Sequence, residues 1–86
     1  MEFVSGMVVI SSAGHDCGRW FVVTGADSRY VYIADGKERR VASPKKKNIR
    51  HVLKTNAVIA AEDMTDKRLR SALRALSAKS IAEESE

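Results

Sequence analysis

The chain has 86 residues, of which 44% are hydrophobic and 30% charged, so it is long enough for one small globular domain and too apolar for a disordered chain. No run of residues approaches the roughly 18 apolar positions that a membrane span requires, so we expect no membrane association. Cys17 has no second cysteine to pair with, and the first residues lack a signal-peptide pattern; both features favour the cytoplasm.

Strand patterns fill the first half of the chain. Apolar and β-branched residues cluster at 4–10, 19–24 and 29–33, and short segments rich in Gly, Ser and Asp separate the clusters. Runs of this kind joined by tight turns predict an antiparallel meander.

The dipeptide Asp35-Gly36 comes next and is a two-residue hairpin signal when strands flank it. We therefore expect residues 30–34 to pair with a strand at 37–41. Pro44 has no N–H to donate and interrupts the pattern, so Lys45–Asn48 is expected to form an exposed loop. A further strand is expected at residues 49–53, and the small residues at 56–60 allow one more.

The last part of the chain changes to a helical period. Apolar residues recur at intervals of three and four, which is the pattern of one stripe on an amphipathic helix. The stripe consists of Leu69, Ala72, Leu73 and Leu76. Thr65 is the expected N-cap, and Asp66 lies in the first turn, where a negative charge suits the helix dipole. We expect the helix at 66–78 and a frayed polar tail at 83–86.

Four or five short strands are too few to form a sandwich of two large sheets. A small, strongly bent barrel buries them best, and closure removes the exposed edges that invite aggregation. The sequence therefore predicts a mainly β fold, with a barrel of about five strands over residues 1–60 and a C-terminal helix and tail over residues 61–86.

Positive charge is concentrated between residues 37 and 54. This segment carries a formal +7 on a chain whose total is +4, and its one acid is Glu38; residues 1–36 and 55–86 carry −2 and −1. The cations are Lys37, Arg39, Arg40, Lys45, Lys46, Lys47, Arg50 and Lys54. A solvated charged face is one interpretation, but charge clustered in this way attracts a phosphate backbone. The segment favours a nucleic acid as partner, and binding rather than catalysis.

Two stretches of this sequence resemble a known family. Gly-Met-Val-Val-Ile-Ser-Ser-Ala-Gly-His-Asp-Cys-Gly-Arg at 6–19 resembles the KOW motif, in which a strand, a Gly-containing loop and a second strand open an SH3-like barrel. Ala34-Asp35-Gly36 and the segment Ser-Pro-Lys-Lys-Lys-Asn-Ile-Arg-His-Val at 43–52 extend the similarity to the KOW-domain ribosomal proteins of the archaeal and eukaryotic large subunit and their small bacterial relatives. The resemblance covers about residues 4–54. It implies an SH3-like barrel that docks on structured RNA, usually ribosomal RNA, without enzymatic activity.

The resemblance also implies a role for the first loop. Gly14 and Gly18 match the two glycines of the motif, and Gly14 would let the backbone approach an RNA strand closely, with His15 and Arg19 adding contacts. Cys17 stands where family members often carry a basic residue, which removes one possible phosphate contact. Turn chemistry alone is the alternative explanation of the two glycines.

The predicted RNA-binding residues come from this loop and from the basic segment. They are Gly14, His15, Arg19, Lys37, Arg39, Arg40, Lys45, Lys46, Lys47, Asn48 and Arg50. Most aromatic side chains are expected in the core, with Trp20 on one face of its strand and Phe21 on the other. A tyrosine, Tyr30 or Tyr32, is the better candidate for stacking on a base, because its hydroxyl tolerates a wet boundary.

Catalytic and metal-binding motifs do not emerge from the sequence. His15, Cys17 and His51 are too few and too badly spaced for a structural zinc site, and a Cys–His nucleophile would need a third group to orient the base. Phosphate-binding and dinucleotide-binding glycine loops are also missing. We therefore expect no enzyme activity, no catalytic residue, no metal and no cofactor.

The expected helix carries cations opposite its apolar stripe. These are Lys67, Arg68, Arg70 and Arg74. They could contact RNA, but Asp63 and Asp66 lie four residues before Lys67 and Arg70, so exposed ion pairs are an equal explanation.

The preferred hypothesis is a non-enzymatic, cytoplasmic RNA-binding module that associates with the ribosome through ribosomal RNA. The alternative is a KOW-type protein-interaction module of the transcription or translation machinery. In that case the basic segment would meet an acidic partner, and the stripe of the C-terminal helix could dock a protein. Binding to DNA is a third possibility.

Overall fold

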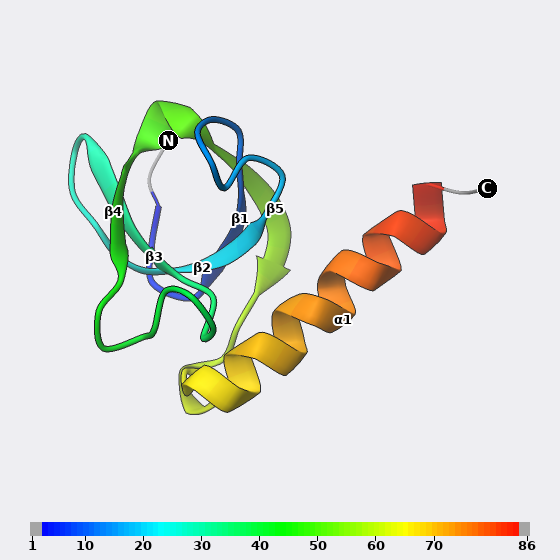
Figure 1. Ribbon diagram of the computed structural model, residues 1–86. Coiled ribbons are helices and arrows are strands. Elements are labelled where there is room, and N and C mark those ends of the chain that lie inside the picture. Colours follow the sequence, from blue (N-terminus) through cyan, green and yellow to red (C-terminus); the bar gives the residue numbers. More distant parts are fainter. Residues whose placement is uncertain (1–2, 85–86) are drawn as a thin grey trace.

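The computed structural model describes residues 3–84 and shows a five-stranded antiparallel sheet followed by a C-terminal helix (Figure 1). The strands are β1 (Met7–Ser11), β2 (Trp20–Ala26), β3 (Tyr30–Ala34), β4 (Lys45–Asn48) and β5 (Val52–Val58). Two 3-10 turns, η1 (Ile49–His51) and η2 (Ala61–Asp63), flank β5, and the helix α1 spans Asp66–Glu84.

The sheet is strongly curved. Strands β1 to β4 form a meander and β5 returns to pair with β1, which gives the order β4-β3-β2-β1-β5. Figure 1 shows the sheet bent into a ring, with η1 bridging from β4 to β5. The backbone N–H of Ser12 donates to the carbonyl of His51 at 2.9 Å and ties η1 to the loop after β1. The predicted fold class, a small mainly β barrel-like fold with a C-terminal helix, is confirmed.

Strands β1 and β2 are buried on both faces. Val9 and Phe21 belong to the cluster inside the barrel, whereas their neighbours Val8 and Val22 belong to a second cluster on the other face. Leu69 of α1 packs into that second cluster and is fully buried. Two-sided burial explains why both strands are continuous apolar runs rather than alternating ones.

The helix begins as predicted and runs further than predicted. Thr65 accepts a hydrogen bond from the N–H of Arg68 at 3.3 Å, which is the expected cap. The helix ends at Glu84 rather than near 78, so the first half of the predicted tail is helical; Ser85 and Glu86 lie outside the described residues. Within residues 3–84, no helix has the length and apolar character needed to cross a bilayer.

The predicted hairpin at Asp35-Gly36 is wrong. Residues 37–41 form a loop rather than a strand, and β3 pairs with β4 instead. The Asp35 carboxylate accepts the backbone N–H groups of Lys37 and Arg39, both at 2.9 Å, so the chain coils around this side chain. An aspartate bonded in this way favours a compact turn over a strand ladder.

The lysine run is also not the expected exposed loop. Lys45–Asn48 is β4, paired with β3 in a register that places Tyr30 opposite Asn48 and Ile33 opposite Lys45. The strand expected at 49–53 is instead the turn η1, followed by β5, which also takes up most of the segment expected at 56–60. Pro44 precedes β4 and so does not interrupt it.

Candidate nucleic-acid interface

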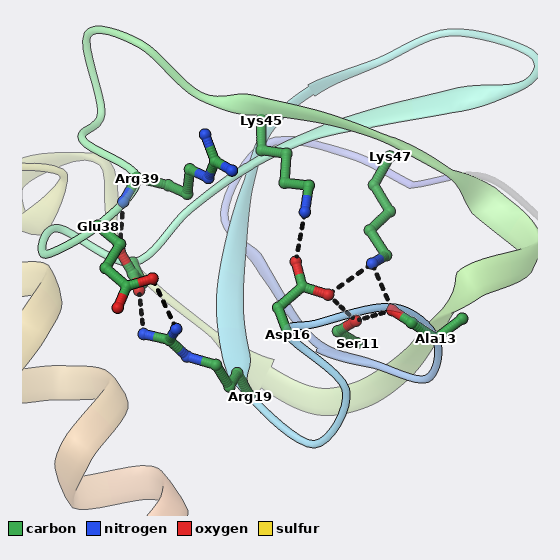
Figure 2. A network of polar contacts seen from close by, with 9 residues as sticks. Ser11, Ala13, Asp16, Arg19, Glu38, Arg39, Lys45 and Lys47 are labelled. Carbon is green, nitrogen blue, oxygen red and sulfur yellow. Dashed lines mark hydrogen bonds and ion pairs between the residues drawn. The ribbon is translucent and has the colours of Figure 1, made fainter.

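A buried carboxylate organises part of the basic segment (Figure 2). Asp16 Oδ1 accepts hydrogen bonds from Ser11 Oγ and Lys47 Nζ, each at 2.6 Å, and Asp16 Oδ2 pairs with Lys45 Nζ at 2.9 Å. Lys47 Nζ also donates to the carbonyl of Ala13 at 2.6 Å. These contacts join β4, one end of the sheet, to the loop between β1 and β2.

Successive side chains of β4 point to opposite faces of the sheet, so the three lysines have different surroundings. Lys47 is 8% exposed and Lys45 is half-buried, so two ammonium groups of the run face inward toward Asp16. Lys46 points the other way, with its Nζ 4.2 Å from the centre of the Tyr30 ring, a cation–π contact. Of the three lysines in this run, Lys46 alone has its ammonium free of a carboxylate among the described residues.

The ionisation of Asp16 follows from this network. Burial by itself would raise the pKa of the Asp16 carboxyl, but the hydrogen bonds from Lys47, Ser11 and Lys45 outweigh it, and the pKa lies well below its ordinary value. Asp16 is therefore ionised at neutral pH and compensates one of the two positive charges of Lys45 and Lys47.

The loop of the suggested KOW motif is a set of turns. Gly14 and Gly18 have positive φ values of 85° and 87°, which only glycine adopts freely. Gly14 accepts a hydrogen bond from the N–H of Cys17 at 3.2 Å, and Gly18 donates to Ser11 at 2.8 Å. Turn chemistry accounts for both glycines, and His15 between them is exposed.

Arg19 is engaged by two acids. Its guanidinium pairs with Glu38 at 2.7 Å (Figure 2) and with Asp35 at 3.3 Å. The hydrogen bond with Glu38 raises the pKa of Arg19 and outweighs the opposite effect of burial. Glu38, the single acid of the basic segment, thus pairs with Arg19, which lies outside the segment. The arginines of the segment itself have no carboxylate partner among the described residues.

Several cations of the basic segment are exposed and have no ion pair among residues 3–79. They are Lys37, Arg39, Arg40, Lys46, Arg50 and Lys54. The first three lie in the loop between β3 and β4 and are called the loop cations below. Lys54 lies on β5, away from them in the sheet order.

The structure brings four of the predicted residues together and separates two others. His15, Arg19, Arg39 and Lys45 line a hollow of about 170 Å³, together with Asp16 and Glu38. Asn48 and Arg50 line a different hollow of about 350 Å³ at the opposite end of β3 and β4, with Arg29 beside them. Arg29 was not among the residues predicted from the sequence. Its backbone carbonyl accepts a hydrogen bond from the N–H of Ile49 at 3.0 Å, which holds the two segments side by side.

The helix contributes cations to the same side as the loop. Arg70 and Arg74 line a groove between α1 and the barrel, and Lys37 and Arg19 line it from the barrel side. Asp66 accepts the N–H of Val41 at 2.8 Å instead of pairing with Arg70. The ion pairs expected for Lys67 and Arg70 are not found among the described residues, where Asp63 pairs with Arg68. The spacing of four residues between Arg70 and Arg74 is the sequence signal for this face.

Metal ligands do not gather in the part of the chain that the structure describes: no group of three or more His, Cys, Asp or Glu side chains lies close enough to hold an ion. Comparison with known proteins adds no assignment, because no family model and no curated protein matches the chain. The KOW resemblance therefore stays an expectation that rests on the residues quoted for it.

Proposed function

We propose that this protein is a non-enzymatic RNA-binding module of the cytoplasm that docks on the phosphates of structured RNA, with ribosomal RNA and the ribosome as its partners. The observation that carries the proposal is the uneven pairing of charge. Asp16, Asp35 and Glu38 are all engaged by Lys or Arg side chains, while the loop cations beside them are exposed and unpaired among residues 3–79. Uncompensated cations gathered on one loop are what a polyanion attracts.

The rigidity of that loop supports the proposal. The Asp35 carboxylate fixes its start through two backbone N–H groups, and Asp66 of α1 holds Val41 near its middle. The cations are therefore presented by an ordered backbone, which lowers the entropy lost on binding. A rigid cationic loop contacts phosphates and carries little base information, so recognition would depend mainly on RNA shape.

The test is a matched pair of double variants that remove equal charge. Arg39→Gln with Arg40→Gln should weaken binding to a structured ribosomal RNA fragment, and should make the slope of log affinity against log salt shallower by about 1.4–1.8 for two lost phosphate contacts. Neither side chain makes a hydrogen bond or an ion pair among the described residues, so the fold should be unaffected.

Lys54→Gln with Lys79→Gln is the control, because both side chains are exposed and lie on β5 and α1 rather than on the loop. Filter binding or fluorescence anisotropy at several salt concentrations measures the slopes. Equal weakening by the two double variants would mean that net charge, rather than this loop, governs binding, and the proposal would be wrong.

The alternative function, a protein-interaction module, had two candidate surfaces, the basic segment and the apolar stripe of the helix. Leu69 and Leu73 of the helix stripe are buried against the barrel, so the stripe does not offer a docking surface. The loop cations could still meet an acidic protein. Pull-down from lysate with and without ribonuclease separates the two functions, because partners that survive nuclease treatment would favour the protein-interaction module.

A further inference from the structure

The groove between α1 and the barrel has the size of a ligand site. Its volume is about 580 Å³, within the range of roughly 300–1,000 Å³ typical of small-molecule sites. One wall is α1, from Arg70 to Ser77, and the other comes from Trp20 and from Lys37 in the loop after β3. Figure 1 shows that α1 begins against the barrel and runs away from it toward its C-terminal end.

The two walls of the groove are held together by contacts between α1 and the loop after β3. Gly36 has a positive φ of 76°, and a Cβ atom there would overlap the backbone of Asp66 at the start of α1. Arg70 Nη1 donates to the Gly36 carbonyl at 3.1 Å, and Asp66 accepts the N–H of Val41. The loop and the helix are thus held together by backbone packing and by two hydrogen bonds.

The lining combines a flat apolar surface with a cationic rim. Trp20 is half-buried, packs against the core cluster beneath α1 and lines the groove beside Leu73. Lys37, Arg70 and Arg74 supply three exposed positive charges, and the single carboxylate of the lining, Asp35, is paired with Arg19. An aromatic surface rimmed by cations suits a planar ring that carries a phosphate.

We propose that the groove accepts one unpaired nucleotide of the bound RNA, with its base against Trp20 and its phosphate between Arg70, Arg74 and Lys37. This inference rests on the proposed function and adds a structural preference to it. A base inside a duplex is stacked and cannot reach the indole, whereas a bulged base can. The protein then binds folded RNA through the loop cations and selects, through the groove, an RNA with an extruded nucleotide.

The fluorescence of the protein tests this directly, because Trp20 is its one tryptophan. The probes are two RNA hairpins of equal stem length, one fully paired and one with a single bulged adenosine. The bulged hairpin should bind about five- to tenfold more tightly and should quench the tryptophan emission at saturation. The paired hairpin should bind through the loop cations and leave the emission unchanged.

A matched pair of helix variants assigns the effect to the groove. Arg74→Gln should remove most of the preference for the bulged hairpin and leave binding to the paired hairpin nearly unchanged. Arg68→Gln is the control, because Arg68 is exposed on the same helix and does not line the groove; its side chain makes only exposed contacts, with the Asp63 carboxylate and the Glu62 carbonyl. It should alter neither affinity.

The outcomes separate this inference from the proposed function. Equal affinity for the two hairpins with unchanged tryptophan emission would overturn the nucleotide site, while sensitivity to Arg39→Gln with Arg40→Gln would still support the RNA-binding function. If neither hairpin, nor the ribosomal fragment, binds, both the function and the site fail. Quenching that Arg74→Gln and Arg68→Gln reduce equally would also overturn the site.

Discussion

The ion pairs of Asp16 determine which of the three consecutive lysines is available to a ligand. From the sequence they form an exposed cationic loop, and each of them is a candidate phosphate contact. In the structure, Asp16 takes two of the three ammonium groups into a largely buried network. The partner lies 29 and 31 residues away in the chain, so no local pattern could identify it.

Removing the Asp16 charge should destabilise the fold. Asp16→Asn leaves the buried ammonium of Lys47 without its counter-ion, and loss of one member of a buried pair costs about 3–5 kcal/mol. Glu38→Gln is the matched control, because its pair with Arg19 is exposed and should contribute about 1 kcal/mol or less. Urea unfolding measures both free energies. Equal costs for the two variants would show that the network does not hold β4 in place.

The same carboxylate predicts how stability depends on pH. Its pKa is lower in the folded protein than in the unfolded chain, so its contribution is fully present above the unfolded value of about 3.9 and is lost as pH falls toward the lower folded value. The urea midpoint should therefore fall below about pH 4. The fall should be smaller in Asp16→Asn, and an identical decline in that variant would assign the effect to other carboxylates.

A charge reversal at Lys45 is a natural test of RNA binding from the sequence alone, and the structure argues against it. A carboxylate at position 45 would face Asp16, so the variant would combine a folding defect with any loss of binding. Arg39 and Arg40 carry no such structural role, which is why they are the better positions.

Among the secondary-structure elements, the sequence predicts correctly those whose conformation depends on neighbouring residues in the chain. The runs that became β1, β2 and β3, the cap at Thr65 and the apolar stripe of α1 all follow from periodicity and capping chemistry, and all are confirmed. The segment from Asp35 to His51 is the part that was wrong. Its conformation depends on partners outside it, and a dipeptide signal carries no information about them.

Gly36 is the clearest case, since its sequence signal and its structural function differ. The residue allows the loop to contact the first turn of α1 rather than closing a hairpin. Gly36→Ala should therefore cost more than the roughly 1–2 kcal/mol of a left-handed backbone alone. Gly18→Ala is the matched control, because Gly18 has a similar φ and nothing within 4 Å of an added Cβ. Thermal or urea unfolding compares them, and equal costs would rule out the close packing on Asp66.

The sequence predicted the positive charge of the candidate site but not how its residues are arranged in space. The sequence identified the basic segment, and the structure gathers Arg39 with His15, Arg19 and Lys45 but places Arg50 at the other end of the strands. The contribution of α1 to the groove could not be predicted from the sequence, because it depends on the angle at which α1 packs against the barrel. That angle is set by contacts between core residues far apart in sequence.

For the whole molecule, the core includes residues from both the barrel and the helix. Val8, Val22 and Ile59 of the barrel share one buried cluster with Leu69 and Leu73 of α1. The helix is thus a wall of the core, although it lies outside the region that resembles the KOW family.

Truncation after Asp63 tests this shared core. The shortened chain should lose cooperative unfolding, because one face of β1 and β2 would be exposed to water. Removal of residues 80–86 is the control, since every core and groove residue named above precedes them. Near-ultraviolet circular dichroism of Trp20 and urea unfolding report the outcome. A truncated barrel that unfolds as cooperatively as the full chain would contradict a shared core.

The two-sided burial of β1 and β2 also restricts how this protein can evolve. Neither strand has a free face on which a polar substitution could be accepted, so new partner preferences must arise in the connections between strands and along the outer side of the helix. The segment between β3 and β4 contributes few side chains to either cluster, so the charges at its exposed positions can change without disturbing the core, whereas Asp35 and Gly36 are held by their contacts. A scaffold of this kind separates the residues that maintain folding from those that natural selection can adjust.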